Sequence, residues 1–501
     1  MKELKDMDWN KLGIILFIIS IAYLLVSSYI GLFKANMWLD EHFSFYLVKM
    51  PLSSMITAGI DDVHPLLYYF ILKAFVKIAA LLNITNLEVP GVIASLTPFY
   101  LLLVLSYTKI KDNFGLLSAG IFSLCIVSMP QLLRYSIEVR MYGWALLFLT
   151  MSYIYIYEIN KENSLKKWGI LTILSIMSCH THYFAAVTSF SLYFVFLAYI
   201  LYKKRELLKN WLLSGTIIVL AYIPWVPSLL YQIHKVHKSY WIDPISIDTI
   251  ISYFYYVFSP SKGYIDANAI LAPDILGSLM LLCFILLTAY YVFNPNEKIG
   301  KYPLYGLIAV IIVPTIGVTI SLLFSPIFFM RYLILLLGII WLCFSIFLEN
   351  IKDKKLLFSI ILVFILIVGS ISLIDFIDIE NANYQKELEM KEVFYQNIPP
   401  GSVIIYDSFY GYISSTVLDN NYTAIRCDNL EDITKGDNLQ KSDSNKYLKE
   451  TLHNKTKEKM NDNAEIFIVD TDEHCSKLKE LGYDLDMIYE DEENKIYKLN
   501  P

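Results

Sequence analysis

Long apolar runs recur along the chain and are separated by short polar loops, a pattern typical of helices that cross a membrane. A helix needs about 20 apolar residues to span the hydrocarbon core of a bilayer. The runs predict about eleven transmembrane helices, near residues 12–33, 89–108, 114–133, 138–157, 168–181, 183–202, 211–231, 272–293, 303–324, 328–348 and 355–375. A further apolar segment, 66–82, is shorter and carries Lys73 and Lys77, which predicts a juxtamembrane helix at the outer face.

The composition agrees with this pattern. Hydrophobic residues make up 56% of the 501-residue chain and charged residues only 18%, which excludes an ordinary soluble protein. We expect no nucleic-acid partner. After Ile374 the chain becomes polar and acidic and stays so to its end. We therefore predict an all-α polytopic membrane domain over residues 1–375, followed by a small soluble α/β domain over residues 376–501.

The polar region carries the signals of a small mixed sheet. Apolar runs that each end at an aspartate predict strands over 402–407 and 465–470, and a third strand is expected over 495–499. Helices are expected over 446–460 and 475–481. The two aspartates suggest either a site or ordinary turn and cap residues, and the sequence leaves this open.

The distribution of lysine and arginine predicts the orientation in the membrane. Basic residues are concentrated in five short loops, around Lys109, Lys166, Lys204, Lys301 and Lys354. Such loops favour the cytoplasmic side. All five lie on that side if segment 66–82 does not cross. We therefore predict a multi-pass protein of the cell membrane with a cytoplasmic N-terminus and an extracytoplasmic C-terminal domain.

An acidic pair, Asp40-Glu41, follows the first apolar run on the predicted outer side. Carboxylates at a membrane boundary are costly unless they face water, a partner or a substrate. Neighbouring residues on a helix point about 100° apart, so the two are expected to act differently. One carboxylate can serve as a general base. The alternative is an acidic pair that complements the dipole at a helix start.

A second outer motif runs from Asp62 through His64 and Pro65 to Tyr68. Pro65 suits the first turn of a helix that Asp62 could cap. Capping does not explain His64, which could bind a sugar, orient a carboxylate or ligate a metal. Asp40, Glu41 and His64 together could hold a divalent cation such as Mg²⁺ or Mn²⁺, although their spacing is not diagnostic.

Cations gather at the same predicted face. Arg134, Arg140 and Arg331 lie at the starts of apolar helices, and guanidinium groups bind phosphate oxygens in a bidentate manner. The three arginines therefore predict a phosphate-binding site, to which Lys73 would contribute if its helix lies in the interface. Arginines that snorkel to the headgroups are the alternative. His182 and Tyr183 lie in a turn on the same side and are expected to line a substrate site.

Taken in order, these motifs resemble those of GT-C class membrane glycosyltransferases, in the branch (glycosyltransferase family 39-like) related to protein O-mannosyltransferases and the lipid A aminoarabinose transferase. The resemblance covers residues 10–350. This sequence departs from the family pattern at Leu66, where a second proline is usual. The matching motifs are Asp40-Glu41, Asp62–Tyr69, Glu138–Tyr142, His182–Phe184 and Arg331-Tyr332. The resemblance implies a GT-C fold and adds Tyr142 and Tyr332 to the expected substrate-binding residues.

The same resemblance implies transfer of a sugar from a polyprenyl-phosphate donor to an acceptor outside the cytoplasm, which could be a protein, a lipid or a wall glycan. The lipid phosphate is already a good leaving group, so one base and several cations suffice, and direct displacement inverts the anomeric centre. We predict Asp40 as the base. A lipid or saccharide transporter or flippase, a non-enzymatic envelope assembly protein and a transferase with a diphosphate carrier are the alternative hypotheses.

Overall fold

The fold was analysed in a computed structural model of the whole chain. The structure describes residues 8–34, 37–84, 86, 88–238, 242, 244–259, 272–406, 423–426, 465–469, 479, 484–490 and 495–500. The chain divides into two compact units, and each is made of two segments. The larger unit consists of a first segment up to Phe33 and a second segment, Ser44–Ile379; the smaller unit consists of Lys34–Phe43 and Glu380–Pro501. The predicted boundary at residue 375 stays a prediction.

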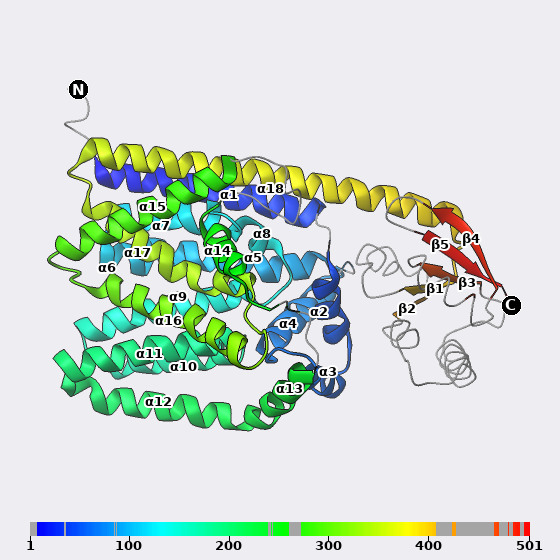
Figure 1. Cartoon of the computed structure of the whole chain (residues 1–501), viewed down its shortest axis with the longest axis horizontal. Helices are drawn as coiled ribbons and strands as arrows, with labels where there is room; N and C mark the ends of the chain where they lie inside the picture. Colours follow the sequence, from blue (N-terminus) through cyan, green and yellow to red (C-terminus); the bar gives the residue numbers. More distant parts are fainter. Residues whose placement is uncertain are drawn as a thin grey trace. The chain divides into compact units, whose positions relative to one another are not determined.

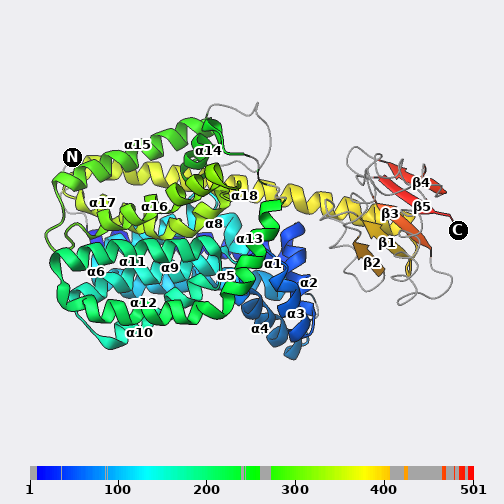
Figure 2. The same ribbon diagram turned by 60° about the horizontal axis from the view of Figure 1, so that its bottom comes forward.

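The larger unit is a bundle of helices that run side by side (Figures 1 and 2). Its first helices are α1 (Trp9–Lys34), α2 (Leu39–Lys49), α3 (Leu52–Ile60), α4 (Leu67–Leu81), α5 (Glu88–Leu105), α6 (Lys111–Phe114), α7 (Leu116–Ser128), α8 (Leu132–Ile137) and α9 (Tyr142–Lys161). The later ones are α10 (Leu165–Cys179), α11 (Tyr183–Lys203), α12 (Leu208–Tyr222), α13 (Val226–Lys238), α14 (Ile247–Phe258), α15 (Ala272–Phe293), α16 (Tyr302–Leu323), α17 (Leu337–Asn350) and α18 (Lys355–Asn397). The start of α2, up to Phe43, and the end of α18, from Glu380, belong to the second unit.

A helix lies at each of the eleven predicted spans, but not all of these helices match a full crossing. In the described part of the chain, eight helical segments are long and apolar enough to cross a membrane. Helices α7 and α10 have only 13 and 15 residues. The protein is thus a multi-pass membrane protein by its apolar helices, and the count of eleven crossings and the orientation stay predictions.

Three of the predicted spans differ from the helices in the structure by a break, a later start or a longer C-terminal end. The predicted span 211–231 is divided by a 3₁₀ turn, Ile223–Trp225, because Pro224 and Pro227 lack the N–H that a continuous helix needs. The predicted start at 138 is wrong, since Glu138 is extended and α9 begins at Tyr142. Helix α18 continues well past 375 and ends at Asn397, just before the pair Pro399-Pro400.

The centre of the bundle is closely packed. Every residue from Leu337 to Leu348 on α17 is buried, and Trp341, Phe344 and Phe347 are among the largest fully buried side chains. Helices α1 and α18 contact each other through Trp9 and Phe358. Because the core is filled in this way, space for a ligand is found near the ends of the helices.

The second unit contains a five-stranded sheet with the order β2-β1-β3-β5-β4. Its strands are β1 (Val403–Tyr406), β2 (Thr423–Arg426), β3 (Ile466–Val469), β4 (Leu485–Glu490) and β5 (Lys495–Leu499). Strand β1 pairs in parallel with β2 and β3, and β5 pairs antiparallel with β3 and β4. The three predicted strands are confirmed as β1, β3 and β5.

Strands β2 and β4 were not expected, because β2 begins with Thr423 and ends with Arg426 and β4 mixes Asp486 and Glu490 with apolar residues, so neither is an uninterrupted apolar run. The aspartates at 407 and 470 and the predicted helices 446–460 and 475–481 lie outside the described residues, except for the single residue Lys479.

Candidate functional site

A large apolar cavity of about 890 Å³ lies within the helical unit. Its walls are formed mainly by α11, α13 and α16, through residues such as Val187, Phe190, Ile233, Ile316 and Ile320. At one end the lining changes to His64, His182 and Tyr332. An apolar cavity that ends at a few convergent polar groups is the usual form of a ligand site.

The two histidines meet at this end of the cavity. Their ring centres are 5.1 Å apart, and the exposed fractions are 7% for His64 and 2% for His182. His64 lies in the loop before α4, and His182 is the N-cap residue of α11. The two segments are joined by a backbone hydrogen bond from Leu67 N–H to His180 O, 3.0 Å long.

Capping of α11 determines which nitrogen of His182 carries the proton. Phe184 N–H donates to His182 Nδ1 at 3.1 Å, so this nitrogen is an acceptor. A neutral imidazole has one acceptor and one donor nitrogen, and Nε2 therefore carries the hydrogen. Within the described part of the chain, neither His182 Nε2 nor His64 Nδ1 has a hydrogen-bond partner. Buried polar atoms without a protein partner are rare, and these two nitrogens can bind a ligand.

The surroundings keep both imidazoles neutral. Burial is the main cause that lowers the pKa of His182, to about 3, and the charges of Arg140 and Arg331 lower it further. Burial, Arg140, His182 and Arg331 also hold the pKa of His64 well below its ordinary value. At neutral pH the positive charge at this end of the cavity therefore belongs to the two guanidinium groups.

The arginines come from distant parts of the sequence. Arg140 is 4% exposed, and its Nη1 donates to Ser44 Oγ on α2 at 3.2 Å. Arg331 is half-buried, and its guanidinium carbon lies 5.3 Å from the ring centre of Phe329. Both act electrostatically on both histidines. The structure thus brings together four of the predicted site residues: His64, His182, Arg140 and Arg331.

An aromatic cluster holds Tyr332 and His182 in place. The ring of Tyr332 lies 4.9 Å from that of His182 and stacks on Phe184 at 5.0 Å, and the ring of Tyr142 lies 5.7 Å from His182. The extended segment before Arg331 is fixed because the N–H groups of Ile327 and Phe328 donate to Ser321 Oγ. The cluster therefore has little freedom to move.

Gly317 is required by this packing, since a Cβ atom there would lie 2.3 Å from the Phe328 ring.

Other predicted residues take supporting positions. Tyr183 lines the cavity, donates to Gln232 Oε1 and accepts from Trp225 Nε1. Asp62 accepts a hydrogen bond of 2.7 Å from Tyr69, and Tyr68 is fully buried beside Tyr69.

The other two predicted phosphate-binding cations are Lys73 and Arg134. Lys73 Nζ donates to the carbonyl oxygens of Val48 and Met50, at 2.7 and 2.6 Å, and so stabilises the end of α2. Arg134 is exposed on α8. A phosphate contact from either residue stays a prediction.

Asp40 and Glu41 belong to the other unit and lie in the first turn of α2. The N–H of Trp38 donates to Glu41 Oε2 at 3.0 Å, so Glu41 caps the start of this helix. Within the described residues, no group of three or more His, Cys, Asp or Glu side chains is arranged to hold a metal ion. The cation site of Asp40, Glu41 and His64 stays a prediction.

The sequence analysis missed Ser44, Gln232 and Phe328. Serine, glutamine and phenylalanine are common beside membrane helices, so only the fold identifies their roles. The spacing of Asp40 and Ser44, four residues apart in one helix, is the one signal that could have indicated Ser44.

Comparisons with known proteins identify the fold. No protein-family model and no curated protein sequence matches the chain. Its structure is similar to that of ArnT from Cupriavidus metallidurans in the apo state, with a TM-score of 0.59 and 9% identity, and in complex with undecaprenyl phosphate, with a TM-score of 0.56 and 10% identity. Each match covers 96% of this chain and 97% of ArnT.

The structure of this chain is also similar to that of the archaeal oligosaccharyltransferase AglB from Archaeoglobus fulgidus, in complex with an inhibitory peptide and a dolichol-phosphate. That match has a TM-score of 0.50 and 10% identity and covers 91% of this chain and 69% of AglB. The predicted GT-C fold is thereby confirmed.

Proposed function

We propose that this protein is a glycosyltransferase that moves a sugar from a polyprenyl-phosphate carrier to an acceptor hydroxyl or amine on the outer face of the membrane. The observation that supports the proposal most strongly is the apolar cavity that ends at two buried neutral imidazoles, both of which feel the positive charge of Arg140 and Arg331. Its apolar part suits a polyprenyl chain. Its polar end suits a phosphate, because arginine and an N–H donor both bind phosphate oxygens.

The bound lipids of the structural neighbours agree with this assignment of the carrier. ArnT is in complex with undecaprenyl phosphate and AglB with a dolichol-phosphate. Both lipids combine a long isoprenoid chain with a phosphate, the combination for which the cavity offers an apolar wall and a cationic end. The AglB complex also contains an inhibitory peptide. For this chain a protein, a lipid and a wall glycan are all candidate acceptors.

In the proposed reaction, Asp40 removes the proton from the acceptor as the acceptor attacks the anomeric carbon. The bond from that carbon to the phosphate oxygen breaks, and the configuration inverts. Two observations on α2 favour Asp40 over Glu41. Glu41 caps the helix, whereas Asp40 lies four residues before Ser44 and so shares its face of the helix.

The departing phosphate gains negative charge, and stabilising that charge lowers the barrier. Arg140 and Arg331 supply positive charge, and His182 Nε2–H supplies one donor. Because the leaving group needs no proton, a histidine that stays neutral is suitable for this role. The reaction therefore needs one base and a cationic site, in contrast to the two carboxylates of glycoside hydrolysis.

A transfer assay tests the proposal. Purified full-length protein is incubated with labelled polyprenyl-phosphate sugars and membrane extracts that supply protein, lipid and glycan acceptors. We expect transfer by the wild type and a loss of about 100- to 10,000-fold in Asp40→Asn, because general-base catalysis contributes roughly 10²–10⁴-fold. Asp61→Asn, which changes an exposed aspartate in the loop after α3, should be near normal.

Wild-type rates in Asp40→Asn would remove this residue from the mechanism. Absence of transfer with every donor, together with movement of a labelled lipid between leaflets, would favour the flippase hypothesis instead.

A further inference from the structure

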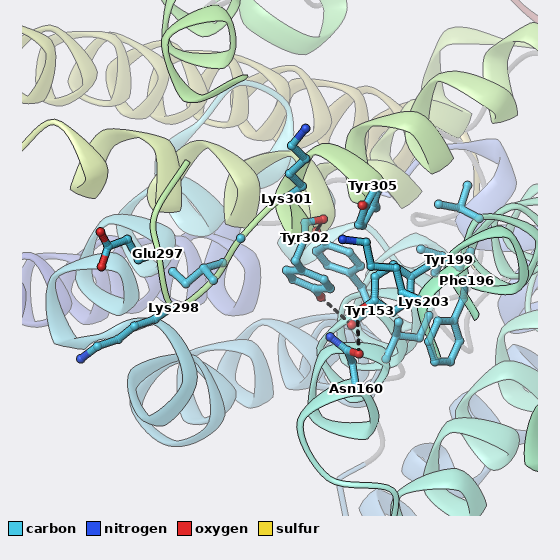
Figure 3. Close-up of a pocket in the computed structure, with 15 residues that line it drawn as sticks. Tyr153, Asn160, Phe196, Tyr199, Lys203, Glu297, Lys298, Lys301, Tyr302 and Tyr305 are labelled. Atoms are coloured by element: carbon cyan, nitrogen blue, oxygen red, sulfur yellow. Dashed lines mark hydrogen bonds between the residues drawn. The ribbon is translucent and has the colours of Figure 1, made fainter. Parts of the chain in front are cut away.

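A second cavity, of about 400 Å³, lies at the other end of α11 and α16 (Figure 3). It is lined by α9, α11, the loop before α16 and the start of α16. Its size falls within the usual range of ligand sites, about 300–1,000 Å³. It shares no lining residue with the cavity that contains His64 and His182.

The lining changes from charged to apolar along one face of α11. Lys203, Tyr199, Val195 and Leu192 all line the cavity and follow one another at intervals of three or four residues. Eleven residues of α-helix separate the first from the last, which corresponds to about 16 Å at roughly 1.5 Å per residue. A ligand that fits this face has a polar head and an apolar tail.

The walls near the polar end are preformed. Tyr153 and Tyr302 stack at 4.4 Å, and each hydroxyl donates to the backbone carbonyl of the other, at 3.1 and 2.6 Å. Tyr199 donates to Asn160 Oδ1 at 2.9 Å, and its ring lies 5.6 Å from that of Tyr305. Dashed lines in Figure 3 mark the bonds between these residues.

The charge of the lining is positive. Three lysines, Lys203, Lys298 and Lys301, are opposed by the single carboxylate of Glu297. In Figure 3, Lys203 is directed toward the tyrosines, whereas Glu297, Lys298 and Lys301 point away from them. Within the part of the chain that the structure describes, Lys203 and Lys301 make no ion pair with a carboxylate. An anionic head group can therefore meet the ammonium group of Lys203, and the exposed side chain of Lys301 can turn to join it.

We propose that this cavity binds an anionic phospholipid, with its phosphate at Lys203 and Lys301 and an acyl chain along Val195 and Leu192. Basic sites between membrane helices near the cytoplasmic surface commonly bind anionic head groups, and each lysine near the surface contributes appreciably. The phosphate could also be recognised without a tail, as a soluble anion. The gradient along α11 favours the lipid. This inference does not depend on the proposed transferase activity.

Native mass spectrometry of the full-length protein tests the inference. The protein is titrated with phosphatidylglycerol, phosphatidylcholine or inorganic phosphate. We expect preferential retention of phosphatidylglycerol, and binding about 10- to 30-fold weaker in the double variant Lys203→Ala/Lys301→Ala. The matched control, Lys166→Ala/Lys209→Ala, removes two exposed lysines that do not line the cavity and should bind as the wild type does.

An equal loss in the control would show attraction to a generally basic surface and would overturn the inference. So would equal retention of phosphatidylcholine, or displacement of phosphatidylglycerol by inorganic phosphate alone, since the site would then not recognise an anionic lipid. All four lysines are exposed, so a failure to fold is not expected to obscure the result.

Discussion

His182 makes two separable contributions, and its substitution by asparagine distinguishes them. Nδ1 caps α11 by accepting from Phe184 N–H, and Nε2–H is the donor proposed for the phosphate. Asparagine is among the best N-cap residues, so His182→Asn is expected to retain the cap. Its shorter side chain withdraws the distal donor. His182→Phe removes both functions and keeps an aromatic ring beside Tyr332.

The expected magnitudes follow from these two hydrogen bonds. A hydrogen bond to a charged group contributes about 1.5–3 kcal/mol, and its loss in His182→Asn should lower transfer by about 10- to 150-fold. Loss of an N-cap costs about 0.5–2 kcal/mol of stability. His182→Phe should therefore lose similar activity and also unfold at a lower temperature, whereas His182→Asn should unfold close to the wild-type temperature.

Transfer kinetics with a polyprenyl-phosphate donor and thermal unfolding in detergent measure the two effects in the same preparations. If His182→Asn retained wild-type kcat/KM for the donor, Nε2 would not bind the phosphate, and the tautomer argument would lose its functional consequence. If His182→Asn were as unstable as His182→Phe, the cap would depend on more than a side-chain acceptor.

Three further predictions concern the same cavity. Burial and the arginines lower the pKa of His182 to about 3, so on acidification the unfolded state binds a proton before the folded state does. The protein should therefore become less stable as the pH decreases from about 6.5 toward 3. Thermal unfolding at several pH values should show a smaller loss of stability at low pH in His182→Asn than in the wild type. Arg331→Lys should raise the KM for the donor by about tenfold, since an ammonium group cannot form the bidentate contact with phosphate. A larger effect on kcat than on KM would instead indicate that Arg331 acts only in the transition state. Ile320→Trp should fill part of the apolar cavity and weaken the binding of long-chain donors more than that of short-chain donors. Ile311→Trp, a change at an exposed position of the same helix, should affect the binding of neither. Equal weakening for both donor lengths would argue against a lipid tail in this cavity.

The sequence predicted the helices better than their breaks. Apolar runs identify membrane helices because the hydrocarbon core tolerates few polar side chains and requires the backbone to satisfy its hydrogen bonds within the helix. The break at Pro224 could have been predicted from proline chemistry. The extended turn at Glu138 could not, because Gln131 adopts a φ of 70° and Glu138 a ψ of 123°, and neither residue type signals such conformations.

For the candidate site, too, the sequence identified the residues of the site better than it identified their partners. His64, His182, Arg140 and Arg331 stood out because charged and imidazole groups at membrane boundaries are costly and need a reason. Lys73 stood out for the same reason, yet its ammonium contacts the carbonyl oxygens at the end of α2. A sequence shows that a cation is present near the interface. Whether backbone oxygens or a ligand satisfy it depends on how α2 and α4 pack.

The two cavities bear on the choice between a transferase and a transporter. Both are lined by α11 and α16, one near Phe184 and Ile320 and the other near Lys203 and Tyr305. Between these ends, α16 buries Ala309, Val310 and Val313, so packed side chains interrupt the lining along this helix. A carrier that moved lipid along this helix pair would need a continuous polar path or a change of packing in its middle. Separate cavities, one ending in buried neutral imidazoles and the other in lysines, instead favour two ligands that each stay at their own end.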